Sequence, residues 1–446
     1  MARSRRKRSR RKSGGGGSGA NKKLPLNQSI PLGIQHVLAM FAGNITVPII
    51  IAGIFGQTTA EKIFLIQMAL FVAGVATIIQ TVGFGKVGSR LPIIQGTSFA
   101  FIPVMVPFAK VGLGAVFTAA FIGGIFQMWI GKMLKPIRHM FPPLVTGIVV
   151  LMIGVSLLKV GFMYAGGGGW LLNNKPEIFG NVNHLFISLT VLIVALVAHQ
   201  KGKGMMSSAS ILVGMVAGYI VAMVLGMVNY GKIASAGWFA FPMPLQYGID
   251  FVPAAIILML FMSIVTTIET IGDISATTMG GANREATDKE LSGGIMADGL
   301  GTAFGSIFNA MPNTSYSQNA GLVAFTGVIS RHVGTVAGVI LILLGLFPKL
   351  GGIIAAMPES VIGGAAIIMF GLITAAGIKL ISQSQMNQRN LLIFALSLSF
   401  GIGMSLLPQF VAHIPDFGIK LKLLLTTGLI PAGFLAFILN ATLPKK

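Results

Sequence analysis

Residues 315–327 read SYSQNAGLVAFTG, a polar start followed by a short apolar run, in a chain that is mostly hydrophobic. The run comes shortly after Pro312, where a helix cannot simply continue. Gln318 and Asn319 offer amide donors and acceptors but carry no charge, and Gly321 leaves the backbone open to close approach. Transporters build binding sites near the middle of the membrane from half-helices that begin in such polar, glycine-containing segments. The stretch therefore predicts a ligand site inside a membrane protein.

The composition agrees with a membrane protein. Of the 446 residues, 54% are hydrophobic and 10% are charged, and the mean hydropathy is +0.84, which is typical of a polytopic membrane protein. Cysteine is absent, which excludes disulfides and thiolate chemistry. The sequence has no phosphate-binding loop, no cluster of zinc ligands and no nucleophile–histidine–acid set. We therefore expect no enzyme activity, no metal and no cofactor other than a coupling proton.

The first twenty residues look unrelated to the fold. Residues 1–20 read MARSRRKRSRRKSGGGGSGA, with eight Lys or Arg among the first twelve, and they contribute strongly to the net charge of +21. This pattern is typical of an appended basic tag with a flexible Gly/Ser linker. A natural basic arm that binds anionic lipid or nucleic acid is the alternative. No apolar run precedes residue 28, so we expect no cleaved signal peptide.

Apolar runs long enough to cross a bilayer recur along the rest of the chain. The long runs are predicted at 29–52, 62–83, 112–131, 142–163, 184–199, 207–229, 251–273, 291–310, 333–356, 358–381, 390–408 and 421–441. Two shorter runs, at 93–109 and 319–330, are interrupted by Pro or Gly and bring the total to fourteen. Lys and Arg favour the loops on the side of the N-terminus, most clearly 132–138 and 284–290, so both termini are expected in the cytoplasm.

The two short runs occupy corresponding places in the chain. Each combines a Gln and a Gly with a short apolar helix, Gln95–Gly96 in the first run and Gln318–Gly321 in the second. They are the third and the tenth of fourteen spans, so each is the third span of a half that contains seven. Because seven is odd, the second half must cross the membrane in the opposite direction to the first. Such an inverted repeat is typical of secondary transporters.

Few ionisable residues lie inside the predicted spans, and such residues are costly enough to indicate function. Glu269 and Asp273 are four residues apart and share one helix face, while Asp298 and His36 lie in the ninth and first spans. Burial favours the protonated form of a carboxyl group, which suits a proton-coupled carrier. The alternative is that these groups pair with one another or with backbone of the broken helices. Phe99 follows the polar start of the third span and is placed to stack on a planar ligand.

These motifs resemble those of the nucleobase–ascorbate transporters, also called the nucleobase:cation symporter-2 family. Residues 318–327 are similar to the family signature, in which Gln, Glu or Pro is followed by Asn, any residue, Gly, four further residues, Thr and then Arg, Lys or Gly. Gln35–His36, Glu269–Asp273 and Asp298 resemble its motifs in the first, eighth and ninth spans. Residues 95–99 match its third-span half-helix loosely. The Gln-Asn start of the signature is similar to that of the xanthine and urate permeases.

The resemblance implies a two-domain fold and a homodimer. A core domain is expected from spans 1–4 and 8–11, at residues 28–140 and 250–357. A gate domain is expected from spans 5–7 and 12–14, at residues 141–249 and 358–446. Short antiparallel strands are expected before the third and tenth half-helices. The expected location is the inner membrane of a bacterium.

The resemblance also implies roles for individual residues. The residue that matches Glu269 binds the base in this family, and the residue that matches Gln318 makes the second polar contact. Ser98, Phe99 and Gly321 are expected to complete the substrate site. The remaining motif residues are expected to orient these groups or to couple protons: His36, Asp273, Asp298, Asn319, Gln35 and Thr326.

We therefore predict a proton symporter that imports an oxidised purine nucleobase, xanthine or uric acid, by alternating access. Ring N–H groups would donate to Glu269, and a ring carbonyl would accept from Gln318. Uracil is the alternative substrate, although uracil carriers of the family tend to have Glu where this chain has Gln318. An anion exchanger or channel of related architecture is a further alternative, but Glu269 would repel the anion. The expected partners are the nucleobase, the lipid bilayer and a second copy of the chain, with no nucleic acid.

Overall fold

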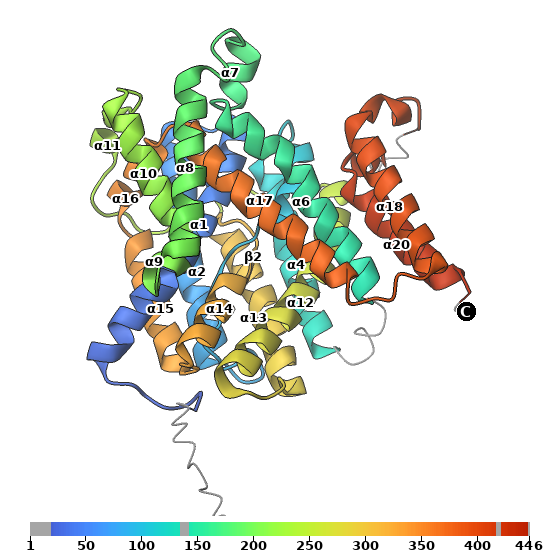
Figure 1. Cartoon of the computed structure of the whole chain (residues 1–446), viewed down its shortest axis with the longest axis horizontal. Helices are drawn as coiled ribbons and strands as arrows, with labels where there is room; N and C mark the ends of the chain where they lie inside the picture. Colours follow the sequence, from blue (N-terminus) through green and yellow to red (C-terminus); the bar gives the residue numbers. More distant parts are fainter. Residues whose placement is uncertain (1–18, 134–141, 416–420, 445–446) are drawn as a thin grey trace, which may run out of the picture.

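The computed structural model describes residues 19–133, 142–415 and 421–444, and their regular secondary structure is almost entirely helical (Figure 1). Within these ranges, eight helices are long and apolar enough to cross a membrane, or nine if one bent pair counts as a single span. The eight are α1 (Leu26–Ile54), α2 (Thr59–Val82), α4 (Leu113–Lys132), α6 (Pro143–Ala165), α8 (Val182–Lys201), α12 (Pro253–Ala282), α17 (Glu359–Ile381) and α18 (Gln388–Leu406). The predicted helical polytopic membrane fold is confirmed at this level. The predicted tag up to residue 18, and Lys135 and Arg138 of the inner loop, lie outside the described residues.

Two predicted long spans are broken rather than continuous. The run at 333–356 forms α15 (Arg331–Gly345) and α16 (Pro348–Ala355), which are bent by 77°. The reason is Pro348, which has no N–H to donate and which disfavours helical backbone at the residue before it. The run at 421–441 forms α19 (Leu421–Thr426) and α20 (Leu429–Thr442), separated where Gly428 adopts a φ of +68°. Each of these predicted spans is therefore built from two helices rather than from one.

The remaining helices are shorter or more polar. They are α3 (Ile102–Met105), α7 (Gly169–Asn174), α9 (Met205–Ser208), α10 (Ser210–Val224), α11 (Tyr230–Ser235), α13 (Asp288–Ile307) and α14 (Ser317–Thr326). Three 3₁₀ segments, η1 (Phe99–Phe101), η2 (Val106–Phe108) and η4 (Pro408–Val411), complete the described helical structure.

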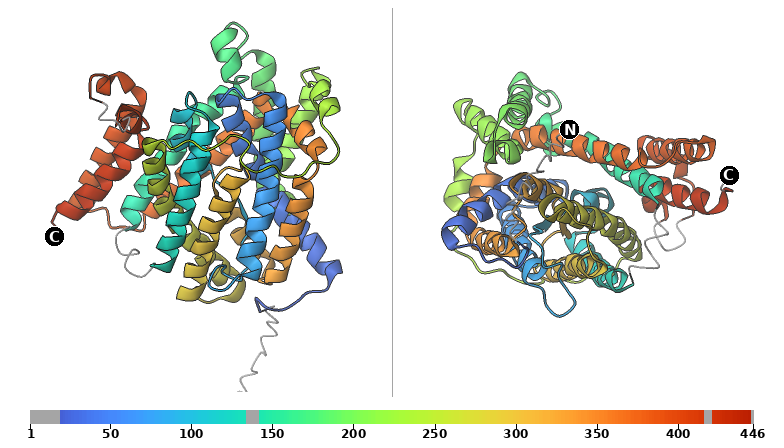
Figure 2. Two further views of the ribbon diagram at one scale, coloured as in Figure 1. Left: turned by 180° about the vertical axis from the view of Figure 1, so that it is seen from behind. Right: turned by 60° about the horizontal axis from the view of Figure 1, so that its bottom comes forward.

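The helices form two groups that face each other, as the tilted view of Figure 2 shows. In the first group, α1 and α15 pack on α2, and α4 packs on α12 and α13. In the second group, α6 and α8 pack on α17, α10 packs on α8, and α18 and α20 pack on α6. Glycines permit the close contact of α6 with α17: a Cβ at Gly154 would lie 2.5 Å from the backbone nitrogen of Thr374.

Two short strands cross inside the first group. β1 (Gln95–Thr97) pairs antiparallel with β2 (Asn313–Ser315), so that Gln95 lies opposite Ser315 and Thr97 lies opposite Asn313. All six residues are buried. Gly96 must be glycine here, because a Cβ would lie 2.6 Å from Met40 and 2.7 Å from Oδ1 of Asn44. The pairing places the starts of two short helices, η1 and α14, side by side.

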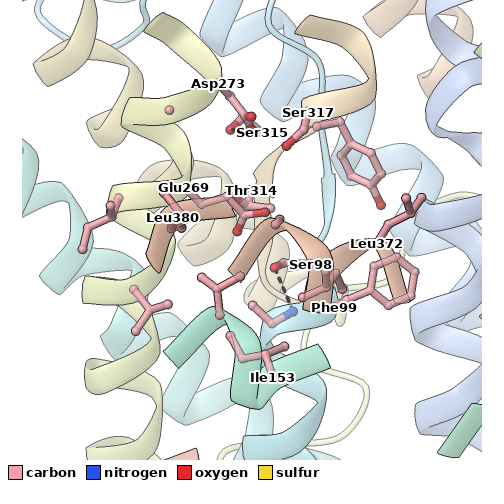
Figure 3. A pocket seen from close by; sticks show the side chains of 18 of the residues that line it. Ser98, Phe99, Ile153, Glu269, Asp273, Thr314, Ser315, Ser317, Leu372 and Leu380 are labelled. Atoms are coloured by element: carbon pink, nitrogen blue, oxygen red, sulfur yellow. Dashed lines mark hydrogen bonds between the residues drawn. The ribbon is translucent and has the colours of Figure 1, made fainter. Parts of the chain in front are cut away.

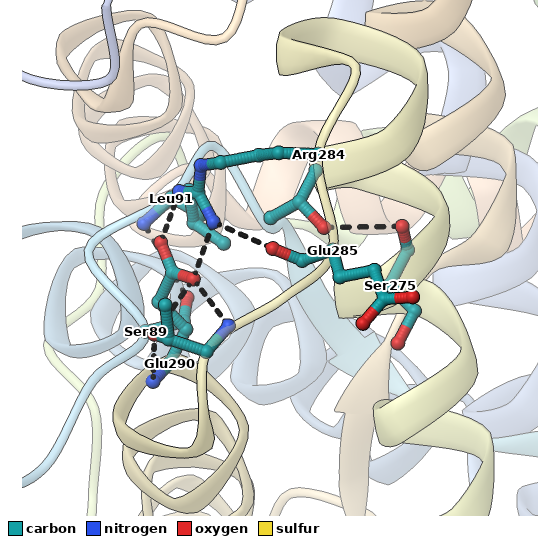
Figure 4. A network of polar contacts seen from close by, with 8 residues as sticks. Ser89, Leu91, Ser275, Arg284, Glu285 and Glu290 are labelled. Atoms are coloured by element: carbon teal, nitrogen blue, oxygen red, sulfur yellow. Dashed lines mark hydrogen bonds and ion pairs between the residues drawn. The ribbon is translucent and has the colours of Figure 1, made fainter.

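A polar turn fixes the start of α13 relative to the end of α12 (Figure 4). α12 ends at Asn283, which adopts left-handed backbone with a φ of +52°. The Arg284 guanidinium then contacts the Glu290 carboxylate at 2.5 and 2.8 Å, and this hydrogen bonding raises the pKa of Arg284. Glu290 also completes a capping box with Thr287 at the N-terminus of α13. The turn therefore sets the register of the helix that carries Asp298.

Candidate functional site

A cavity of about 450 Å³ lies between the two groups of helices (Figure 3). One wall comes from α12, the two strands and the starts of η1 and α14, and the other wall comes from α6 and α17. The first wall carries most of the polar groups of the lining: Ser98, Glu269, Asp273, Ser315, Ser317 and Gln318. The second wall is mainly aliphatic, with Ile153, Leu372 and Leu380 labelled in Figure 3. This arrangement suits a small, flat ligand that has polar edges and apolar faces.

Glu269 is the central group of the polar wall. It lies midway along α12, and its side chain is exposed to the cavity while protein surrounds the position. Its carboxyl group makes no hydrogen bond and no ion pair with any residue that the structure describes. A carboxyl group held at this depth without a protein partner is costly. In this position the Glu269 carboxylate can accept hydrogen bonds from the N–H groups of a ligand, or it can gain and lose a proton.

Gln318 approaches the same cavity from the first turn of α14. Its amide has no hydrogen-bond partner among the described residues. The side chain can therefore both donate to and accept from a ligand. The structure brings Gln318 and Glu269 to one cavity, as the sequence motifs predicted, although they are far apart in the chain.

Phe99 and Ser98 line the cavity at the start of η1. The ring of Phe99 packs edge-to-face against Phe370 of α17, with centroids 5.6 Å apart and planes at 82°. Ser98 caps η1 by accepting a hydrogen bond from the backbone N–H of Ala100 at 3.3 Å. Phe99 therefore presents an aromatic surface to the cavity, whereas the hydroxyl oxygen of Ser98 is occupied in part by the helix start.

Asp273 and Asp298 differ from Glu269 because protein groups donate to both. Asp273 lines the cavity one turn from Glu269 and accepts a hydrogen bond of 2.6 Å from the Ser315 hydroxyl. Asp298 is fully buried outside the cavity lining, and its carboxylate accepts from Nε2 of Gln95 and from the Thr270 hydroxyl. Asp298 thus joins β1, α12 and α13 behind the polar wall.

His36 and Asn319 form a buried pair between α1 and α14. Nδ2 of Asn319 lies 2.9 Å from Nδ1 of His36 and donates to the His36 carbonyl oxygen at 2.9 Å. Both side chains are buried, and neither lines the cavity. The pair fixes α14 directly after Gln318, so it holds in place the helical turn from which Gln318 faces the cavity.

Three further predicted residues lie outside the lining of this cavity. Gly321 lines a neighbouring cavity instead, and no heavy atom lies within 4 Å of the place where its Cβ would be. The Thr326 hydroxyl donates to the Leu322 carbonyl oxygen at 2.9 Å in the last turn of α14. Gln35 is half-buried on α1. Gly321 shares the neighbouring cavity with Gln318 and is absent from the lining that contains Glu269, so its part in substrate binding stays a prediction.

The sequence reasoning did not identify the residues that α17 contributes. Lys379 near the end of this helix and Gln383 just after it line the cavity together with Thr146 near the start of α6. These residues resemble ordinary polar ends of membrane spans, and no local motif distinguishes them. Within the described residues, no cluster of three or more His, Asp or Glu could hold a metal ion.

Comparisons with known proteins relate this chain to permeases. A family model described as the permease family matches residues 27–410. The xanthine permease XanP of Escherichia coli is 35% identical over 436 residues, which cover 95% of this chain and 93% of XanP. The uric acid permease PucJ of Bacillus subtilis is 34% identical over 412 residues, with 92% and 91% covered. The uric acid transporter UacT of Escherichia coli is 36% identical over 419 residues, with 92% and 85% covered.

Solved structures with a similar fold come from more distant proteins. The transmembrane domain of the cyanobacterial bicarbonate transporter BicA has a TM-score of 0.59 at 15% identity and covers 94% of this chain and 99% of that domain. The murine anion transporter Slc26a9 in its inward-facing state has a TM-score of 0.60 at 12% identity, with 91% and 68% covered. At these identities the likeness concerns the fold alone.

Proposed function

Because the chain belongs to the nucleobase–ascorbate transporter family, we propose that it imports an oxidised purine, xanthine or uric acid, together with a proton. The predicted family is confirmed by the match over residues 27–410. The family consists of permeases, so the prediction of a transporter rather than an enzyme is confirmed as well. The choice of base and the coupling to protons belong to the proposal.

The unpartnered carboxyl group of Glu269 carries the proposal. Xanthine and uric acid present N–H groups and carbonyl oxygens along the edge of a flat ring. The N–H groups would donate to Glu269, and a carbonyl oxygen would accept from the Gln318 amide in the same cavity. Phe99 would contact the face of the ring. The free backbone N–H groups at the start of α14 would add donors near the same edge.

Alternating access would arise from movement between the two groups of helices. The cavity lies at their boundary, so a relative displacement would change the side from which the ligand is reached. We propose that the groups are the core and gate domains of a fourteen-span 7+7 inverted repeat. In this proposal the protein is a homodimer in a bacterial inner membrane with both termini in the cytoplasm.

A proton would travel with the base through the carboxyl groups of the polar wall. Glu269 and Asp273 both line the cavity and lie on one face of α12, so a proton gained by one lowers the cost of charge on the other. Asp298 lies behind them and holds Gln95 and Thr270 in place. Transport is then coupled to protons if the two groups of helices move only when the carboxyl groups of the occupied cavity are protonated and uncharged.

Two alternatives make different predictions. Uracil is smaller and also presents N–H and carbonyl groups, so it remains the second candidate substrate. An anion such as bicarbonate or sulfate is disfavoured, because the cavity lining contains Glu269 and Asp273 and a single Lys, Lys379. The likeness to anion transporters concerns the fold, and the chemistry of the lining argues against a small inorganic anion as the ligand.

Uptake into proteoliposomes tests the proposal. Purified protein would be given labelled xanthine, uric acid, uracil, bicarbonate or sulfate, with and without an inward proton gradient. We expect saturable accumulation of one or both purines that a proton ionophore abolishes. Accumulation of bicarbonate or sulfate, with no uptake of any base, would contradict the proposal. Preferential uptake of uracil would support the second candidate.

A further inference from the structure

A second cavity, of about 1120 Å³, adjoins the substrate cavity. One side of it comes from α8, α9 and the start of α10, and the other from α1, α14 and α17. Gln318 and Leu372 line both cavities, so the two meet at these side chains. The mechanism proposed above uses none of the other residues of this lining.

The lining of the second cavity is amphipathic. Its apolar part includes Leu192, Leu196, Leu212, Leu322, Phe325 and Ile368. Its polar part gathers where α8 ends and the chain turns into α9 and α10: His199, Gln200, Lys203, Ser207, Ser208 and Ser210. An α-helix rises about 1.5 Å per residue, so the last turn of α8, at His199, lies roughly 10 Å from Leu192 along the axis. Polar and apolar groups therefore occupy different depths.

The polar part carries positive charge without a balancing carboxylate. Lys203 is the one Lys of the lining, and the lining contains neither Asp nor Glu. The Lys203 and His199 side chains make no hydrogen bond with any residue in the described ranges. The substrate cavity differs in this respect, because Glu269 and Asp273 line it. The second cavity therefore suits an anionic group attached to a long apolar one.

We propose that the second cavity binds an anionic phospholipid, with its phosphate at Lys203 and His199 and an acyl chain against Leu196, Leu322 and Phe325. The ammonium group of Lys203 would bind the lipid phosphate at the membrane surface, where basic side chains attract anionic lipids. The exposed apolar side chains, among them Leu196 and Phe325, would be covered by the chain. A free phosphate would leave this apolar part uncovered, and a zwitterionic lipid would bring no net charge to Lys203.

The site would connect lipid binding to transport through α14. This helix presents Gln318 to the substrate cavity, and it presents Gly321, Leu322 and Phe325 to the second one. A lipid chain between α14 and α8 would restrict movement of the helix that carries Gln318. Transport should therefore depend on the anionic lipid even when the substrate-contacting residues are unchanged.

Native mass spectrometry of protein taken from vesicles of equal phosphatidylglycerol and phosphatidylcholine, with identical chains, tests the proposal. We expect wild-type protein to retain phosphatidylglycerol in preference to phosphatidylcholine. Lys203→Gln should lower the retained phosphatidylglycerol about fivefold, the factor expected for one basic residue near a membrane surface. Lys201→Gln is the matched control, because Lys201 is also exposed, lies two residues away and does not line the cavity.

A second pair of variants tests the apolar part. Leu196→Trp should fill the space and reduce the retention of both lipids, whereas Val197→Trp should not, since Val197 is exposed on α8 outside the cavity. Thermal unfolding of each variant would confirm that it is folded. Equal retention of the two lipids by wild type, equal loss in both Lys variants, or displacement of the lipid by glycerol phosphate alone would overturn the proposal.

Discussion

Nδ2 of Asn319 lies 2.9 Å from Nδ1 of His36, and this contact joins α14 to α1 immediately after Gln318, which lines the substrate cavity. The amide donates, so the imidazole nitrogen accepts. His36→Asn shortens the side chain and should weaken the contact without touching the cavity. We expect the maximal rate of uptake to fall more than the apparent affinity. His413→Asn, at an exposed position, is the control. A complete loss of binding with normal expression would place His36 in contact with the base.

We expect Asp298→Asn, like His36→Asn, to lower the rate of uptake more than the apparent affinity, but for a different structural reason. Its carboxylate holds Gln95 of β1 and Thr270 of α12. Asp298→Asn replaces one acceptor oxygen by a donor, so one of these contacts loses its partner and the polar wall loses rigidity. We expect slower uptake with a near-normal half-saturation concentration, while Asp250→Asn at an exposed site leaves uptake unchanged. Unchanged uptake by Asp298→Asn would show that the contacts are dispensable.

Glu269→Gln should uncouple transport from protons and weaken binding. The variant keeps the shape of the side chain but removes its charge and its capacity to gain a proton. Binding should weaken because a charge-assisted hydrogen bond is lost, and accumulation driven by a proton gradient should collapse. The measurements are a binding isotherm and uptake with an imposed gradient, with Glu177→Gln, at an exposed position, as the control. Wild-type accumulation by Glu269→Gln would rule out its role in coupling.

Gln318→Glu tests which base the cavity selects. An ionised glutamate only accepts hydrogen bonds, so a purine carbonyl that faces it would lose its donor. The cost should be roughly 1–3 kcal/mol, or about one to two decades in affinity for xanthine and uric acid. Gln318→Asn keeps both functions at a shorter reach and should be milder. If Gln318→Glu binds purines as well as wild type, the amide does not contact the ring carbonyl.

Gly96→Ala should destabilise the protein by crowding the strand crossing. The added methyl group would lie within 2.8 Å of Met40, Asn44 and Tyr316. Overpacking of this kind typically costs about 1–3 kcal/mol. Gly371→Ala is the control, because no atom lies within 4 Å of the corresponding position on α17. The measurement is the thermal unfolding midpoint in detergent, and equal midpoints for the two variants would contradict the expectation.

The sequence predicted the position of the site better than it predicted the full set of residues that line it. Glu269 and Gln318 could be predicted because a carboxylate within an apolar run and an amide at a broken helix are both costly and therefore informative. The breaks at Pro348 and Gly428 were missed, because apolar composition continues across both positions and only the backbone turns. Hydrophobicity reports that a segment lies in the membrane, but not whether it crosses in one piece.

The partners of each polar group could not be predicted for a related reason. Gln95 was recognised as part of an interrupted span, but its contact with Asp298 joins residues that are 203 positions apart. Such contacts depend on which residues of β1 lie opposite which residues of β2. The family resemblance implied two short antiparallel strands but not this register. Gly321 is a further case: it lies beside Gln318 in the second cavity, as the spacing indicates, but it is absent from the lining that contains Glu269.

The two walls of the substrate cavity differ in polarity, and this difference would lower the resistance to movement between them during transport. Hydrogen-bonding groups gather on the wall of α12 and α14, whereas Ile153 and Leu372 represent the facing wall of α6 and α17. Polar residues of that second wall, such as Thr146 and Lys379, lie toward the helix ends. In the proposed mechanism, a base held on the first wall would meet the second mainly through dispersion contacts, which have no preferred register. The loaded wall would then slide along the other without breaking a directional bond at each step.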